Sequence, residues 1–289
     1  MTSYQNAILL SVLAHPDDET FGMGGTLAYY ALNGAHVHLI CATRGEVGEV
    51  PPEMMSGFAT IAELRESELR CAAKALGIED VIFLDYRDSG MPGSPDNAHP
   101  NALAAQQIDL VAAKIVSHIR QIKPQVVLTF DPIGGYKHPD HIAIHQATVL
   151  AFKLAGDPNY QDPEKLPAYQ PARLFYHTIS RGFIKMAIWM LRLTGKDPSK
   201  WGKNGDIDMV SIAKESYPVH ARVNYSTVTE IRSKASACHA SQGGSASTGF
   251  VQSIMEKIFR SSDTFMQAYP EQAPAYPIND LFSGIDLVK

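Results

Sequence analysis

The sequence predicts an α/β fold in which a mostly parallel sheet is flanked by helices, with an irregular C-terminal part. Short apolar runs alternate with longer stretches of helical periodicity, which is typical of strand–helix–strand units. The runs are apolar without alternation, as expected for strands that are buried on both faces. At 289 residues, the chain is long enough to bury a substantial core around such a sheet.

Five runs are predicted to be the strands of this sheet: 7–14, 35–43, 81–86, 125–131 and 172–180. Helices are predicted at 21–34, 57–77, 101–122 and from Pro139 onward, and Gly34 and Gly77 provide stop signals. Connections between parallel strands are right-handed, and ligand sites lie at the carboxyl ends of the strands. Residues that carry chemistry are therefore expected directly after a strand.

The second half of the chain is less regular, but no linker divides it from the first. We expect one domain over 1–289, with a core of about 5–180 and a C-terminal elaboration of about 181–289. The predicted pieces are a loop at 155–171, an amphipathic helix at 181–194, an exposed excursion at 197–208, a helix at 226–240 and a Gly/Ser-rich turn at 241–249. The segments after residue 180 could cover a cleft or join subunits of a homo-oligomer.

The overall charge excludes some partners. The chain has 25 Lys and Arg against 30 Asp and Glu, a formal charge of −5, and no basic block. Such a chain is a poor candidate for binding nucleic acid or anionic membranes. The N-terminal apolar run is too short for a membrane span and lacks the basic flank of a signal peptide. We expect a cytoplasmic protein without nucleic-acid or membrane partners.

Cysteine is scarce and histidine is not. The three cysteines, Cys41, Cys71 and Cys238, have no metal-ligand spacing, so we expect neither a disulfide framework nor a cysteine-rich zinc module. The chain has eleven histidines. A metal in this protein would therefore be bound by histidine and carboxylate side chains.

The first motif follows the first predicted strand and reads Ala14-His15-Pro16-Asp17-Asp18-Glu19. Burying several carboxylates together is costly unless a cation compensates their charge. Histidine and aspartate are natural zinc ligands, and a neighbouring free carboxylate can accept a proton from water. The alternative is an acidic turn that caps the next helix.

The second motif follows the fourth predicted strand and runs from Asp131 to His141. Pro139 suits the first turn of a helix, and His138 and His141 are spaced so that the helix start can direct both to one point. The alternative for the two motifs is a pair of unrelated polar caps. Two such motifs after parallel strands can instead meet across a crevice of the sheet, which favours a site.

The motifs AHPDDE and HPDH resemble those of the LmbE-like, or PIG-L, family of zinc-dependent de-N-acetylases. Further matches are Ala42 to Glu46, Arg65 with Glu66 and Glu68, Arg87 to Met91, and a C-terminal His239-Ala240-Ser241-Gln242 element. The resemblance is close over about 7–150 and loose beyond. It implies a Rossmann-like core, in agreement with the strand pattern.

The resemblance implies a zinc site with one open position. It assigns His15, Asp18 and His141 as the three ligands, the arrangement of catalytic rather than structural zinc. It assigns Asp17 as the general base, next to a ligand but not bound to the metal. Because such sites are not selective by affinity alone, Fe(II) or Co(II) could replace zinc.

The resemblance also implies three further catalytic residues. His138 would stabilise the oxyanion or protonate the leaving amine, and Tyr136 would assist at the carbonyl oxygen. Asp140 would orient a histidine from behind the metal. Which group protonates the amine is left open between Asp17 and His138.

Four residues are candidates for substrate binding. Arg65, Asp88 and Met91 match positions of mycothiol-pathway relatives, and polar groups in fixed positions suit sugar hydroxyls. Glu46 follows a predicted strand and could lie near the site. The alternatives are a surface helix charge for Arg65, a turn carboxylate for Asp88 and solvent exposure for Glu46.

Together these features predict an enzyme that hydrolyses an N-acyl amide, such as an N-acetyl group, on a small glucosamine-containing substrate. Alternatives are a mycothiol S-conjugate-type amidase, another metal-dependent amide or ester hydrolase, and a sugar-binding module without activity. A nicotinamide-binding protein is disfavoured, because Gly22 and Gly24 begin a dinucleotide fingerprint that Leu27 does not complete.

Overall fold

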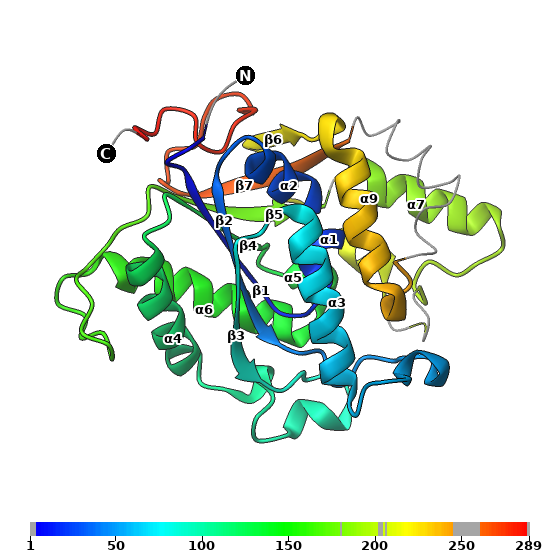
Figure 1. Ribbon diagram of the computed structural model, residues 1–289. Helices are drawn as coiled ribbons and strands as arrows, with labels where there is room; N and C mark the ends of the chain where they lie inside the picture. The colour runs from blue at the N-terminus through cyan, green and yellow to red at the C-terminus, as the bar shows by residue number, and fades with distance from the viewer. Residues whose placement is uncertain (1–3, 180, 202–204, 206, 245–260, 288–289) are drawn as a thin grey trace.

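A computed structural model of the chain describes residues 4–179, 181–201, 205, 207–244 and 261–287. Its centre is a seven-stranded sheet with the order β3-β2-β1-β4-β5-β7-β6 (Figure 1). The strands are β1 (Ile8–Leu13), β2 (His36–Thr43), β3 (Asp80–Tyr86), β4 (Val126–Phe130), β5 (Arg173–Thr178), β6 (Ala221–Asn224) and β7 (Ser262–Tyr269). The first five are parallel to one another, and β7 is antiparallel to both neighbours. The predicted α/β class is confirmed.

Helices cover both faces of the sheet (Figure 1). Helices α4 and α6 pack together on one face, and α2, α3 and α9 pack together on the other. The helices of the described residues are α1 (Asp18–Phe21), α2 (Gly24–Leu32), α3 (Ile61–Leu76), α4 (Ile108–Ile122), α5 (Gly134–Lys137), α6 (Pro139–Gly156), α7 (Arg181–Leu193), α8 (Met209–Ile212) and α9 (Thr229–Cys238).

Local signals explain where the elements begin and end. The Thr60 side chain accepts a hydrogen bond from the Glu63 backbone amide and caps α3, and Gly77 ends this helix with φ of 79°. Every residue of β4 is buried, as expected for the apolar run at 125–131. The five predicted strands and the helix at 57–77 are therefore present, with ends that differ by a few residues. The helix predicted at 101–122 begins only at Ile108, because residues 103–105 form a separate 3-10 turn.

A buried arginine holds the loop predicted at 155–171. The Arg120 guanidinium on α4 is 3% exposed and donates hydrogen bonds to backbone carbonyls at the end of α6 and in the loop. Its acceptors are the carbonyls of Leu154, Ala155, Asp157, Tyr160 and Leu166. The carbonyls of Leu154, Ala155 and Asp157 also accept one backbone amide each, so Arg120 adds a second hydrogen bond at the end of α6 and ties the loop to it.

The C-terminal part is less irregular than expected, because it adds β6 and β7 to the sheet. These strands were not predicted, since β7 mixes apolar residues with the buried polar side chains of Asp263 and Gln267. The helices expected at 181–194 and 226–240 are present as α7 and α9. Parts of the predicted excursion and turn, residues 202–204, 206 and 245–249, lie outside the described residues.

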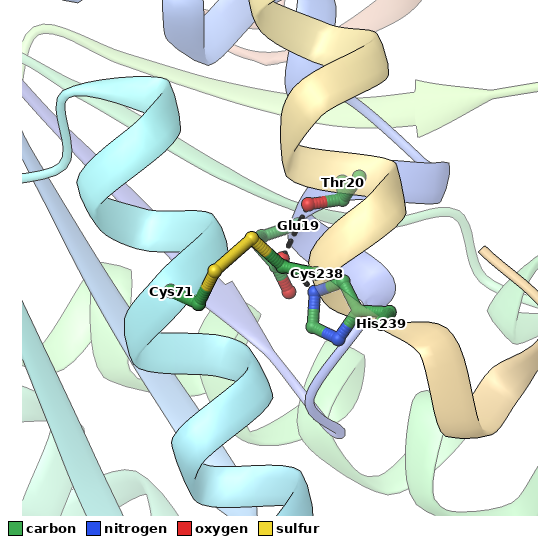
Figure 2. Close-up of a disulfide and its surroundings, with 5 residues drawn as sticks. All are labelled: Glu19, Thr20, Cys71, Cys238 and His239. Carbon is green, nitrogen blue, oxygen red and sulfur yellow. Dashed lines mark hydrogen bonds and ion pairs between the residues drawn. A yellow bond between two sulfur atoms is a disulfide. The ribbon is translucent and has the colours of Figure 1, made fainter. Parts of the chain in front are cut away.

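One disulfide corrects the expectation that the cysteines form no bridge. It joins Cys71 on α3 to Cys238 at the end of α9, with their Cα atoms 5.8 Å apart (Figure 2). The two residues are 167 positions apart in the sequence, so only the packing of α3 against α9 brings them together. Cys41 is buried and free.

The strand order creates a crevice between β1 and β4. These strands are hydrogen-bonded neighbours, yet the chain leaves β1 toward one face of the sheet and β4 toward the other. Such a switch point leaves a gap at the carboxyl ends of the strands, where ligands bind in open α/β sheets. Among the described residues, no helix is both long and apolar enough to cross a membrane.

Candidate metal centre and active site

The loops that follow β1 and β4 bring three side chains to one point in the crevice. His15 Nδ1 lies 3.1 Å from His141 Nε2. The carboxylate oxygens of Asp18 lie 3.5 Å from His15 Nδ1 and 3.3 Å from His141 Nε2. All three side chains are buried. The structure thus brings together the three residues predicted to hold a metal.

The outer nitrogens of both imidazoles face hydrogen-bond acceptors. His15 Nε2 lies 3.1 Å from Asp140 Oδ2, and His141 Nδ1 lies 3.2 Å from the Gly134 carbonyl oxygen. Since a carboxylate and a carbonyl can only accept, both outer nitrogens carry protons. The nitrogens that face each other then present lone pairs when the rings are neutral. A cation between them would replace this repulsion with attraction.

The spacing of these three side chains is compatible with a zinc ion. Ligands at about 2.0–2.1 Å in tetrahedral positions are about 3.3 Å from one another. The two imidazole nitrogens are 3.1 Å apart, and Asp18 approaches His141 Nε2 with Oδ1 at 3.3 Å and His15 Nδ1 with Oδ2 at 3.5 Å. Within the described residues, two triplets have one ligand atom from each member all within 4.8 Å of one another: His15 with His138 and His141, and His15 with Asp88 and Asp140. The donor set therefore fits a divalent metal.

The electrostatics of the cluster also favour positive charge. Burial would lower the pKa of His15, but the carboxylates of Asp88, Asp140 and Asp18 raise this pKa well above its ordinary value. Burial would raise the pKa of Asp18, but His141 and His15 lower it well below the ordinary value. Asp18 is thus an ionised carboxylate, as a metal ligand must be.

Asp17 lies beside this cluster and lines the cavity. Arg65 Nη2 donates to Asp17 Oδ2 at 3.1 Å and to the Pro16 carbonyl at 2.6 Å. Burial raises the pKa of Asp17 to about 6, with Arg65 opposing and Asp18 adding to the shift. A carboxyl group with such a pKa can serve as a base near neutral pH.

A glycine makes room for Arg65. Gly45 has φ of 67°, and a Cβ at this position would overlap the Arg65 guanidinium. Instead, the Gly45 carbonyl accepts a hydrogen bond from Arg65 Nη1 at 3.0 Å. Arg65 is 4% exposed. The structure therefore places it against Asp17 rather than on a helix surface.

His138 packs against His15 and Tyr136 against His141, and both line the cavity. His138 caps α6, and its Nδ1 accepts from the Asp140 amide at 3.2 Å, which leaves Nε2 with the proton of a neutral ring. Burial and the two neighbouring histidines, His15 and His141, lower the pKa of His138. Burial raises the pKa of Tyr136, so its hydroxyl stays protonated. Both are available as hydrogen-bond donors.

Asp140, in the first turn of α6, and Asp88, in the loop after β3, both support the cluster. Ser89 donates to the Asp140 carboxylate through both its hydroxyl and its amide. Asp88 Oδ1 lies 3.5 Å from His15 Nε2 and accepts from the Gly90 amide at 2.8 Å. Asp140 is fully buried, whereas Asp88 also lines the cavity.

The cavity has a volume of about 870 Å³ and opens above the cluster. Of the predicted substrate-binding residues, Arg65, Asp88 and Met91 line it. Glu46 does not. Its carboxylate accepts a hydrogen bond from the Asp88 amide at 3.0 Å, so it supports the loop that carries Asp88.

Sequence reasoning assigned no role to several buried residues around the site. Glu19 belongs to the first motif but received no role, and the C-terminal element suggested only that His239 could reach the cleft. The structure joins them, with His239 Nε2 2.7 Å from Glu19 Oε1. Residues 240–243 line the cavity directly after His239. His220, the other C-terminal histidine that could have reached the cleft, instead accepts a hydrogen bond from the amide of Gln267 in β7.

A buried cluster of histidine and aspartate side chains beside a cavity suits a metal-dependent hydrolase that cleaves linear amide C–N bonds, as deacetylases do. Residues 10–152 match the PIG-L family, GlcNAc-PI de-N-acetylase. The chain belongs to this family, which confirms the resemblance seen in its motifs. It is similar to 1D-myo-inositol 2-acetamido-2-deoxy-alpha-D-glucopyranoside deacetylase of Thermobifida fusca, with 36% identity over 85% of this chain and 86% of the relative.

Solved structures show the same fold with more distant sequences. N,N'-diacetylchitobiose deacetylase from Pyrococcus horikoshii has a TM-score of 0.61 and 20% identity over 90% of this chain and 83% of its own. A 4-carboxy-2-hydroxymuconate hydratase from Pseudomonas putida also has a TM-score of 0.61, with 15% identity over 93% and 99% of the chains. Since the fold carries two reactions, it does not determine the function by itself.

Proposed function

We propose that this protein removes the N-acetyl group from a glucosamine-containing substrate, with zinc held by His15, Asp18 and His141. One observation carries the proposal: the donor atoms of these three residues converge at 3.1–3.5 Å beside Asp17. The name of the Thermobifida fusca relative favours a substrate in which an N-acetylglucosamine unit is joined to inositol. A zinc ion bound here would act as a Lewis acid at the amide carbonyl and would lower the pKa of water.

Asp17 is proposed as the general base. Its carboxylate faces the cavity, and Arg65 holds one of its oxygens at 3.1 Å. The base accepts a proton from the attacking water. Proton transfer of this kind contributes about 10²–10⁴-fold to the rate.

His138 and Tyr136 are proposed to stabilise the oxyanion. The neutral His138 ring presents Nε2–H, because its Nδ1 accepts from the Asp140 amide. The protonated Tyr136 hydroxyl provides a second donor. Asp17, once protonated, is then the group that returns a proton to the leaving amine, since the lowered pKa of His138 disfavours its charged form.

The cavity lining supports recognition of a polar substrate. The carboxylate of Asp88 and the guanidinium of Arg65 can bind hydroxyl groups, and Met91 offers an apolar contact. The second candidate is the amide of a mycothiol S-conjugate, which presents the same kind of linear C–N bond. A sugar-binding module without activity has no need of a base such as Asp17.

A direct test is a deacetylation screen over N-acetylglucosamine conjugates, including the inositol glycoside, with amine release as the measurement. The metal content of the same preparation is measured in parallel. About one zinc per chain and activity that a chelator abolishes are the expected results. Activity that persists after metal removal, or a metal-free protein, contradicts the proposal.

A further inference from the structure

The backbone of Asp17 is in a conformation that residues with a Cβ rarely adopt. Its φ is 117° and its ψ is −27°. Such a conformation persists only where the surrounding structure holds it in place. The Asp17 carbonyl accepts from the amides of Thr20 and Phe21, and the Asp17 amide donates to Glu19 Oε2 at 2.9 Å. The Glu19 side chain therefore forms a short hydrogen-bonded turn with the backbone of Asp17, the residue proposed as the base.

Glu19 is fully buried, and three donors share its carboxylate. Oε2 accepts from the Asp17 amide, while Oε1 accepts from the Thr20 hydroxyl at 2.5 Å and faces His239 Nε2 at 2.7 Å. Figure 2 shows His239 reaching this carboxylate from the end of α9. The contact joins residues that are 220 positions apart, and His239 is fully buried as well.

His239 is itself anchored to α3 on both sides. The residue before it, Cys238, forms the disulfide with Cys71 (Figure 2). Two residues after it, Ser241 donates to the Glu68 carboxylate through its amide at 2.8 Å and its hydroxyl at 2.6 Å. Helix α3 also carries Arg65. One helix thus holds the Asp17 side chain directly and, through His239 and Glu19, the Asp17 backbone.

We propose that Glu19 and His239 are positioning residues that hold Asp17 in its working geometry, and that the Cys71–Cys238 disulfide anchors His239. The inference rests on the proposed role of Asp17 as base. Neither positioning residue lines the cavity. They act through Asp17, so their loss lowers kcat and leaves KM almost unchanged.

The first test compares two variants of His239. His239→Gln keeps an N–H donor near the position of Nε2, whereas His239→Leu removes it. We expect kcat to fall about 10²-fold in His239→Leu, with KM within about twofold. His239→Gln should retain kcat within about threefold of the wild type. Similar kcat values for the two variants overturn the proposal.

A matched control separates positioning from general destabilisation. Thr148 is buried in α6, where its hydroxyl donates to the Ile144 carbonyl, away from the catalytic residues. Thr148→Val also removes one buried hydrogen bond and should leave kcat within about twofold of the wild type. Glu19→Gln is the second test variant. The amide that it introduces has only one oxygen, so its NH₂ group must point at one of the donors from which Glu19 now accepts a hydrogen bond. If His239→Leu does not fold, kcat and the hydrogen exchange of the Asp17 amide are measured in Glu19→Gln instead.

The second measurement does not depend on activity. Hydrogen exchange of the Asp17 amide reports the Glu19 contact directly. We expect exchange about tenfold faster in His239→Leu and Glu19→Gln, and wild-type exchange in His239→Gln and Thr148→Val. Wild-type exchange in His239→Leu contradicts the proposal, whatever its kcat.

The disulfide is tested by Cys71→Ser with Cys238→Ser. The expected loss of kcat is smaller, about three- to tenfold, because the Glu68–Ser241 contact remains. If this double variant has wild-type kcat and wild-type exchange of the Asp17 amide, the disulfide does not anchor His239 and that part of the proposal is wrong. Asp17→Asn distinguishes the two hypotheses: activity in that variant refutes Asp17 as the base, while hydrogen exchange still tests the positioning residues.

Discussion

His15 Nδ1 and His141 Nε2 lie 3.1 Å apart, although 126 residues separate them in the chain. Each ring donates its other N–H to an acceptor, Asp140 for His15 and the Gly134 carbonyl for His141. Phe130 stacks on the His141 ring at 4.0 Å and holds its plane. The two inner nitrogens are thus oriented toward a shared cation before any cation binds.

Metal content is expected to separate ligands from the base. His141→Ala removes a ligand, so the metal bound per chain falls well below one. Asp17→Asn keeps all three ligands, so it retains about one metal per chain while kcat falls about 10²–10⁴-fold. Elemental analysis of both variants after dialysis provides the measurement. Loss of metal in Asp17→Asn would show that Asp17 is a ligand.

Asp140 is expected to control metal affinity from behind His15. Asp140→Asn replaces an acceptor beside His15 Nε2 with an amide that can turn its NH₂ group toward the ring. Loss of such a partner typically weakens metal binding by about 10–100-fold. Competition with a chromophoric chelator measures the affinity. Glu79→Gln, which loses the exposed contact with His36, serves as the control and should bind metal as the wild type does.

The pH dependence of kcat/KM should report the Arg65–Asp17 contact. The base must be deprotonated, so activity falls as the pH drops through the pKa of Asp17. Burial raises this pKa to about 6, and Arg65 opposes the rise. Arg65→Met removes the opposing charge, which raises the pKa further and moves the acid limb to higher pH. Arg65→Lys keeps the charge and should shift the limb less, whereas equal shifts in both variants would contradict this account.

Arg120 is expected to contribute strongly to stability, far from the chemistry. Arg120→Met leaves the carbonyls of Leu154, Ala155 and Asp157 without this donor. We expect the free energy of unfolding to fall by about 2–4 kcal/mol, measured by denaturant titration. Arg70, whose contact with Glu66 is exposed, is the comparison, and Arg70→Met should cost about 0–1 kcal/mol. Equal losses in the two variants would show that the buried contacts contribute little.

The first half of the fold could be predicted because its signals are local. Continuous apolar runs identify strands buried on both faces, and Gly77 and Pro139 mark a helix end and a helix start. Strands β6 and β7 escaped prediction because β7 carries buried polar residues whose partners lie elsewhere in the fold. Asp263, for example, accepts from Thr26, which is 237 residues away.

The site was predictable only in part, again because some of its contacts join residues that lie far apart in the chain. His15, Asp17, Asp18 and His141 belong to two short motifs, and each motif follows a parallel strand. The residues that support these side chains do not belong to a comparable motif after a strand. Glu46 was expected to contact substrate, yet its contact is with the Asp88 backbone. The bridge between Cys71 and Cys238 depends on two helices that pack only in the folded chain.

The sequence by itself determined the class of fold, the family and the candidates for metal binding, because each of these rests on short motifs of residues that are near one another in the chain. The tertiary structure decided which donors face each other, and how Arg65, Glu19 and His239 surround Asp17. Hydrogen bonds and ion pairs act over a few ångströms. Only folding brings residues 48 to 220 positions apart within that range.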